Sequence, residues 1–150
     1  MKTRAYRFAR RLAQVVTLTA ALHAGVQTER PGSGPVLRPD SFRHYFTDFA
    51  RGYLGWFDPN TGKTEEWASP GGPESRPYGI AITPDGMVWY SESGLRPNTI
   101  VRFDPKTKAF ATWPIPSGGG VVRNMVSTPG GDLYIACSGV NKVGIVKVER

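Results

Sequence analysis

The sequence predicts an all-β protein, a partial β-propeller of about three four-stranded antiparallel blades. We expect it to be open rather than closed, with a last blade that lacks its outer strand. The stretch "GWFDPNTGKTEEWASPGG" at 55–72 returns as "VRFDPKTKAFATWPIPSGG" at 101–119, with Asp58 and Asp104 46 positions apart. Runs such as "MVWYSES", "TIVRFD" and "DLYIAC" are β-branched and aromatic, and turn residues separate them. Periods in the forties built from such runs are typical of propeller blades.

Residues 1–24 have the features of an export leader. A basic start precedes the apolar run "LAQVVTLTAAL" at 12–22, and small residues follow up to Ala24. The run is about half of the roughly 20 apolar residues that a membrane span needs. An amphipathic or disordered tail is the alternative. We therefore expect a periplasmic or extracellular protein if the leader acts, and a cytoplasmic one otherwise, with a linker at 25–30.

The net charge of +7 belongs mainly to this leader, which holds five basic residues and no acid before Ala24. The remaining chain carries only +2, so we expect no nucleic-acid partner, and no membrane partner once the leader is removed. The single cysteine, Cys137, rules out an intramolecular disulfide and a Cys-rich zinc site. We expect it to be a buried thiol.

The blades follow in order along the chain. Blade one covers 31–73 and has a degenerate first strand, "SGPVLRPDS", aligned with "YGIAITPDG" of blade two. Blade two covers 74–119 and is complete. Blade three covers 120–150 and copies only the first three strands. Pro84-Asp85-Gly86 and the Asp58 stretch supply turns between strands, and Trp67 and Trp113 should cover the next blade.

Fewer than three complete blades leave an apolar sheet face at each end of the stack, because one blade cannot bury both of its faces and closed propellers use 4 to 8. Such exposed patches usually mark a partner. We expect self-association or pairing with complementing propeller blades.

Several segments resemble the virginiamycin B lyase (streptogramin lyase) family. "WYSESGLRPNTIVRFDP", "YIACSGVNKVGIVKV" and "YFTDFARGYLGWFDP" resemble its "W-F-T-E... N-x-I-G-R" element, and "SRPYGIAITPDG" resembles its "P-H-G-I... G-x-D-G" strand pair. The likeness covers about 30–150. It implies the C-terminal three blades of a seven-bladed ring, in which the last blade takes its outer strand from the N-terminus of the full-length chain.

Antiparallel strands bring the start of strand one, the end of strand two and the start of strand three to one face of the disc. A small-molecule ligand is expected at that face. Asp48 and Glu92 occupy equivalent strand ends and are candidate oxygen ligands for Mg²⁺; the alternative is two solvated acids. The face also receives the candidate binding residues Tyr78, Asn98, Arg123 and Asn141, together with Cys137 and the nearby Arg51.

The resemblance implies a Mg²⁺-dependent C–O elimination, in which a histidine base opens a cyclic depsipeptide antibiotic. Tyr78 occupies the position of the family's histidine, and a phenol with its ordinary pKa near 10 is protonated at neutral pH. His23 lies in the leader, and His44 aligns with Trp89. The sequence thus predicts a lyase-like propeller whose catalytic histidine is absent. The alternative is a non-catalytic, exported binding or assembly module.

Overall fold

The computed structural model describes the backbone of residues 13–18 and the whole of residues 44–149. The described residues form strands and two short 3₁₀ helices, with no α-helix among them, and hence no helix that could cross a membrane. The strands are β1 (Ala13–Leu18), β2 (His44–Asp48), β3 (Tyr53–Phe57), β4 (Thr64–Ala68), β5 (Pro77–Ile82), β6 (Val88–Glu92), β7 (Thr99–Phe103), β8 (Phe110–Pro114), β9 (Val122–Ser127), β10 (Leu133–Cys137) and β11 (Lys142–Val148). The 3₁₀ helices are η1 (Pro73–Ser75) and η2 (Ser138–Val140).

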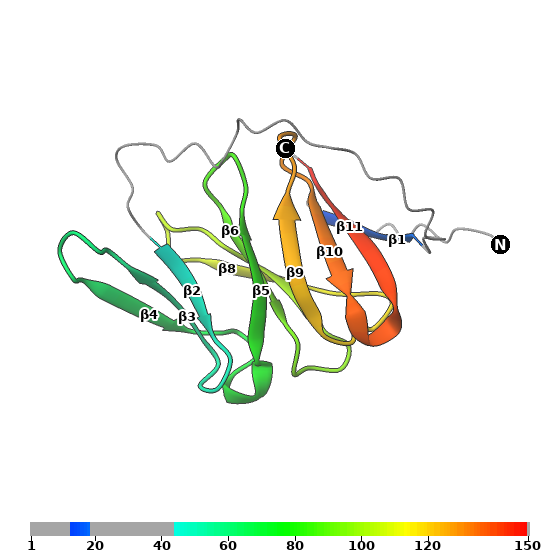
Figure 1. The fold of residues 1–150 in the computed structure, drawn as a ribbon, viewed down its shortest axis with the longest axis horizontal. Coiled ribbons are helices and arrows are strands. Elements are labelled where there is room, and N and C mark those ends of the chain that lie inside the picture. Colours follow the sequence, from blue (N-terminus) through cyan, green and yellow to red (C-terminus); the bar gives the residue numbers. More distant parts are fainter. Residues whose placement is uncertain (1–12, 19–43, 150) are drawn as a thin grey trace, which may run out of the picture.

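The strands form three antiparallel sheets that follow one another along the chain, as the repeat predicts. Blade one contains β2-β3-β4, blade two β5-β6-β7-β8, and blade three β9-β10-β11 with β1 beyond β11. Blade one and blade three stand at opposite ends of the molecule, with blade two between them (Figure 1). The sheets form an open stack, which confirms the predicted fold class.

Blade three draws three strands from its own segment, as predicted, and its fourth from the N-terminal part of the chain. β1 pairs with β11 in antiparallel register, from Ala13 opposite Val148 to Leu18 opposite Val143. These six residues lie inside the run predicted to be the core of an export leader. The free edge expected at β11 is therefore occupied by this chain's own strand.

Blade one has three described strands. The segment predicted to be its degenerate first strand, within 31–43, lies outside the described residues, as do the linker and the predicted cleavage region near Ala24. Blades two and three contact each other through their first strands, β5 and β9. Blade one contacts β5 through β2, where Thr47 Oγ1 donates a hydrogen bond to the Tyr78 carbonyl at 2.9 Å.

Each sheet has two faces, which we call the N-side face, toward the preceding blade, and the C-side face, toward the following blade. Strand alternation assigns the residues to the faces. One core cluster joins the C-side face of blade one to the N-side face of blade two; its buried members are Leu54, Val88, Tyr90, Val101 and Phe103. The second joins blades two and three; its buried members are Trp89, Ile100, Ile115, Val122, Met125, Leu133, Ile135, Cys137 and Val146.

Aromatic residues of the outer strands extend these cores as the sequence predicts. The Trp67 ring, on β4 of blade one, lies 4.6 Å from the ring of Phe103 in blade two. Trp113, on β8 of blade two, stacks on Trp89 at 5.6 Å and packs against the cluster shared with blade three. The repeated tryptophans therefore seal one blade against the next.

The two long hairpin turns repeat the same capping contact. Asp58 accepts the backbone N–H of Asn60 at 2.9 Å, and Asp104 accepts that of Lys106 at 2.8 Å. These backbone hydrogen bonds are the main reason why the pKa of each carboxyl lies below its ordinary value. The Asp-Pro pairs therefore recur because they close equivalent turns.

Candidate functional site

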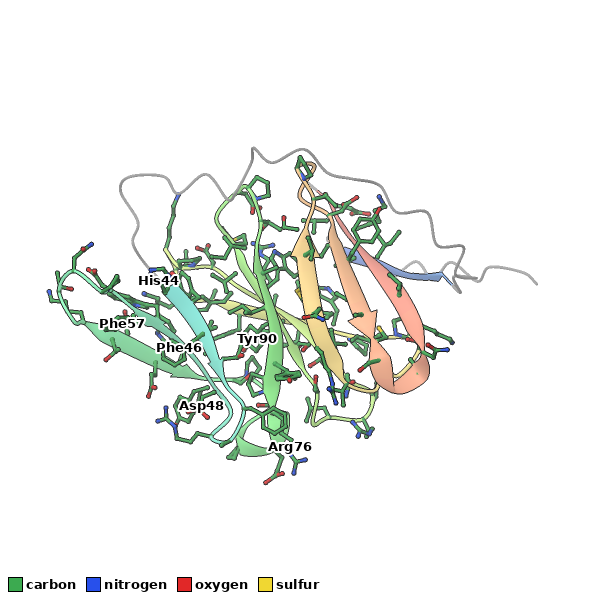
Figure 2. The ribbon with its side chains drawn as sticks, viewed as in Figure 1. His44, Phe46, Asp48, Phe57, Arg76 and Tyr90 are labelled. Atoms are coloured by element: carbon green, nitrogen blue, oxygen red, sulfur yellow. The ribbon has the colours of Figure 1, made fainter. Side chains whose placement is uncertain are left out.

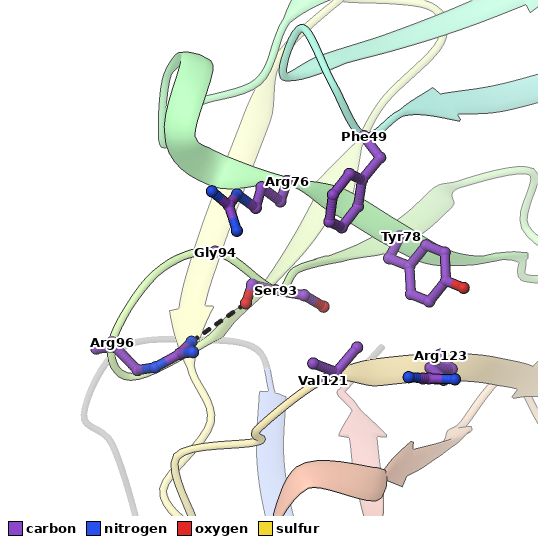
Figure 3. Close-up of a pocket in the computed structure, with 8 residues that line it drawn as sticks. All are labelled: Phe49, Arg76, Tyr78, Ser93, Gly94, Arg96, Val121 and Arg123. Atoms are coloured by element: carbon purple, nitrogen blue, oxygen red, sulfur yellow. Dashed lines mark hydrogen bonds between the residues drawn. The ribbon is translucent and has the colours of Figure 1, made fainter.

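A pocket of about 390 Å³ lies at the ends of the sheets where blades one, two and three approach one another. It occupies the face predicted to carry the site, at the ends of β2 and β6 and the starts of β5 and β9. Its volume is at the small end of the range for small-molecule sites. Eight residues line it: Phe49, Arg76, Tyr78, Ser93, Gly94, Arg96, Val121 and Arg123 (Figure 3).

A buried serine seam holds the walls of the pocket together. Ser91 Oγ donates to the Val122 carbonyl at 3.0 Å and accepts the Gly79 N–H at 3.1 Å. Ser93 Oγ accepts the Val122 N–H at 3.3 Å. Because these bonds join β6 to both first strands, the positions of Tyr78 and Arg123 are fixed by rigid sheets rather than by loops.

The loop after β6 closes one side of the pocket. The Gly94 N–H donates to the Ser75 carbonyl at 2.8 Å, and a Cβ at Gly94 would overlap the Glu74 carbonyl oxygen. Only glycine therefore permits this close approach. Arg96 is anchored in the same loop, since its Nη1 donates to the carbonyls of Ser93 at 3.2 Å and Leu95 at 2.9 Å.

Two aromatic rings form a second wall. Phe49 and Tyr78 meet edge to face with centroids 5.7 Å apart, and the Arg76 guanidinium lies 5.9 Å from the Phe49 centroid. Both residues are exposed over about two fifths of their surface, 45% for Phe49 and 40% for Tyr78. They therefore offer flat apolar surface to a ligand.

The pocket is electropositive. Arg76, Arg96 and Arg123 line it, and none of its described lining residues is acidic. Arg76 forms an ion pair with Glu74 at 3.7 Å, and that glutamate side chain is 85% exposed. Guanidinium groups bind carboxylates and phosphates through paired N–H donors, so the chemistry of the pocket suits an anion.

Of the predicted binding residues, the structure brings Tyr78 and Arg123 into this pocket and places the two asparagines elsewhere. Asn98 is fully buried and donates from Nδ2 to the carbonyls of Ser93 and Leu95, so it shapes the loop that carries Arg96. Asn141 ends η2 with a left-handed backbone, φ 50°. Neither side chain lines the pocket.

Glu92 and Asp48, the two predicted metal ligands, lie on opposite sides of blade one. The two acids hold equivalent positions, since the pair Asp48–Tyr53 ends its hairpin as the pair Glu92–Thr99 does. By strand alternation each acid lies on the N-side face of its own sheet. Glu92 thus faces blade one. Asp48, which is labelled in Figure 2, faces away from blade two. Equivalent positions of adjacent blades are separated by a whole sheet, and packed sheets are about 10 Å apart.

All four carboxylate oxygens of this pair already accept hydrogen bonds. Glu92 is 1% exposed and accepts from Ser69 Oγ and the Gly71 N–H, both at 2.7 Å, and from Thr99 Oγ1. Asp48 accepts two backbone N–H groups and Arg51 Nε, and the Arg51 backbone bond contributes most to lowering the pKa of its carboxyl. As arranged, the two acids do not fit a shared Mg²⁺ site. Among residues 44–149 no group of three or more His, Cys, Asp or Glu gathers as a metal site.

The described histidine lies away from the pocket. His44 begins β2, and the pocket lies beyond the other end of that strand, four residues on; strands rise about 3.3 Å per residue. The predicted alignment of His44 with Trp89 is wrong by one position. His44 pairs with Phe57, and in blade two the equivalent Phe103 pairs with Val88, so His44 is equivalent to Val88. Cys137 is buried in the core, and burial raises the pKa of its thiol.

The sequence analysis did not assign Phe49, Arg76 or Arg96 to the binding site. Phe49 follows the end of β2, Arg76 precedes β5 and Arg96 lies in the β6–β7 loop. A usable signal existed: each stands in a connection at the predicted face, and aromatic or arginine residues in such connections are candidates for ligand contact.

The sheets and their order define a segment of a β-propeller. No family model and no curated protein matches the chain. Among solved structures, it is similar to a streptogramin B lyase, with 18% identity, a TM-score of 0.61 and coverage of 71% of this chain and 34% of that one. It is also similar to a catalytically inactive histidine-to-alanine variant of virginiamycin B lyase from Staphylococcus aureus with quinupristin, with 23% identity, a TM-score of 0.61 and coverage of 71% and 36%.

A selenomethionine-substituted virginiamycin B lyase from S. aureus gives 21% identity, a TM-score of 0.59 and coverage of 77% of this chain and 43% of that one. The matched part of the chain therefore covers more than a third but less than half of the length of each of these structures. At these identities the likeness establishes the fold: this protein has the architecture of part of a streptogramin lyase propeller.

Proposed function

We propose that this chain is a ligand-binding propeller segment, which holds a compact aromatic anion in the pocket between its blades and does not cleave it. The observation that carries the proposal is the combination of three arginines with two half-exposed aromatic rings in one pocket of about 390 Å³. A ring of the ligand would lie against Phe49 and Tyr78. Its carboxylate or phosphate would accept hydrogen bonds from the guanidinium groups.

The absence of a suitable base favours binding over elimination. Removal of a proton next to a carbonyl needs a base that is unprotonated near neutral pH and within hydrogen-bond reach. Tyr78 occupies the position at which the family resemblance implies a histidine, and a phenol is a poor base at neutral pH. Glu92 and Asp48 are engaged by their own hydrogen bonds. Binding therefore uses the arginines and aromatic rings of the pocket, whereas elimination requires an unprotonated base, which the described lining residues do not include.

Streptogramin lyase activity is the second candidate, and the fold similarity favours it. The decisive test is incubation of the purified chain with quinupristin and Mg²⁺. The elimination leaves the mass of the antibiotic unchanged, so retention time and fragment ions must be followed. We expect quinupristin to stay intact, with ring opening no faster than in buffer alone. A linear product that accumulates with enzyme concentration would refute the non-catalytic proposal.

The binding proposal is tested with 2-naphthoate as the probe and 2-naphthalenemethanol as its neutral counterpart, by titration calorimetry. We expect naphthoate to bind more tightly than the neutral probe. We expect Arg123→Gln to weaken naphthoate binding at least about tenfold, since a hydrogen bond to a charged group contributes about 1.5–3 kcal/mol. Arg102→Gln, on β7 outside the pocket, is the matched control. Equal affinity for both probes, or equal losses in both variants, would overturn the proposal.

A further inference from the structure

Among the described residues, no blade packs on the N-side face of blade one in the way that a preceding blade packs on the same face of blades two and three. Phe57 opposite His44, Phe103 opposite Val88 and Val146 opposite Leu133 occupy the same position in the repeat.

Burial separates these three equivalent residues sharply. Phe103 and Val146 are 0% exposed because a preceding blade covers them, whereas Phe57 is 39% exposed. It stands with Phe46 on the end sheet in Figure 2. Blade one thus presents an interface residue to solvent.

The C-side face of blade three is likewise exposed, at the positions that blade three covers in blade two. Tyr134 takes the position of Trp89, and Val143 takes that of Ile100. The two residues of blade two are 1% and 0% exposed under blade three, but Tyr134 and Val143 are 48% and 41% exposed. Val126, opposite Tyr134 on β9, is 62% exposed and widens the apolar surface.

The two exposed faces are built as the two halves of one interface. On the N-side face of blade three, Ile135 lies over Gly144, and this face packs on blade two; a Cβ on Gly144 would approach Ile135 Cγ1 to 2.8 Å. On the N-side face of blade one, Phe46 lies over Gly55 in the same paired position. Blade one is therefore equipped to cover a C-side face, and the end of blade three is such a face.

We propose that two copies of this chain assemble head to tail, with the N-side face of blade one of each copy packed on the C-side face of blade three of the other. A second copy is the occupant that the structure favours, because it carries both complementary faces. The contact would continue the interface that the chain already uses between its blades. The inference does not depend on a ligand in the pocket.

The number of described blades allows a closed ring. Two copies of the three described blades would make a six-bladed ring, within the usual range of 4 to 8 blades, whereas three copies would make nine. A head-to-tail contact closes only if its rotation completes a circle, and otherwise grows into a filament. β1 already pairs with the edge of β11, so the faces are the surfaces available for assembly rather than this strand edge.

The test is the solution mass of the full chain and its variants at micromolar concentration, by light scattering after chromatography and by sedimentation velocity. The wild type should have twice the mass of the 16.4 kDa chain. Phe57→Glu and Tyr134→Lys each place a charge in the contact and should weaken the dimer at least about 100-fold. Lys106→Glu, in the β7–β8 turn of the middle blade, should leave it unchanged.

Mixing the two variants distinguishes a head-to-tail contact from a symmetric one. In the mixed dimer one interface is fully wild type and the other joins the new glutamate to the new lysine, so dimerisation should return. Circular dichroism checks that each variant is folded, and Val143→Lys replaces Tyr134→Lys if the latter is not. A monomeric wild type, dimers insensitive to both charges, no recovery on mixing, or growth into filaments would overturn the closed pair.

Discussion

Glu92 illustrates how an acid at a strand end can be structural. Its carboxylate ties its own strand β6 to two other segments: Ser69 and Gly71 in the connection after β4, and Thr99 on the neighbouring strand β7. Gly71 allows this approach, since a Cβ there would lie 2.9 Å from Glu92 Oε1. The sequence placed Glu92 at the correct face, but two of its donors, Ser69 and Gly71, lie more than 20 positions earlier, outside blade two. Spacing within one blade gives no sign of them.

The structural role predicts a loss of stability from Glu92→Ala. The substitution leaves the Gly71 N–H and the Thr99 hydroxyl without their acceptor, and it leaves Ser69 Oγ with Tyr90 Oη as its partner. An unsatisfied buried group costs about 1–3 kcal/mol. We expect the free energy of unfolding in urea to fall by about 3 kcal/mol or more. Glu74→Ala, at a side chain that is 85% exposed, should change it by less than about 0.5 kcal/mol. An unchanged stability combined with a loss of Mg²⁺ binding would show instead that Glu92 is a metal ligand.

β1 shows the limit of sequence reasoning at the level of the element. An apolar, β-branched run beside basic residues satisfies both the pattern of an export leader and that of a strand, and its pairing partner β11 stands at the other end of the chain. The hairpins of blades one and two were predictable because both strands and their Asp-Pro turn are contiguous. Export remains a prediction, but removal of residues 1–24 would also remove the outer strand of blade three.

Deletion should reveal that strand. In a chain that lacks residues 1–18, alternate amides of β11 lose their hydrogen-bond acceptors on β1, and we expect them to exchange with solvent at least about tenfold faster. The other amides of β11 bond to β10 and should stay protected, as should β7. A chain that lacks only residues 1–11 retains β1 and is the control. Identical exchange of β11 in both shortened chains would show that β1 does not pair there.

The whole molecule was the most predictable level, and the reason is the repeat. A fixed offset between Asp58 and Asp104 implies equivalent sheets, and equivalent sheets must stack to bury their faces. The composition of the pocket was less predictable, because its residues come from all three blades and most of them stand in connections between strands. Phe49 and Arg76 meet only after the stack forms, and no periodicity within one blade indicates the contact.

Assembly of two open stacks predicts that stability depends on protein concentration. Folded chains are withdrawn into the dimer while unfolded chains are not, so each tenfold rise above the dissociation constant should add roughly 0.7 kcal/mol per chain, half of the value for binding a separate ligand. For a chain of this size, the melting temperature should rise by about 2 °C per tenfold step. Calorimetry between 2 and 200 μM, about two tenfold steps, would measure the trend.

Phe57→Glu should melt at a temperature independent of concentration, because its charge prevents the faces from closing, whereas Lys106→Glu should retain the wild-type slope. A flat profile for the wild type would mean that the exposed faces of blades one and three do not cover each other.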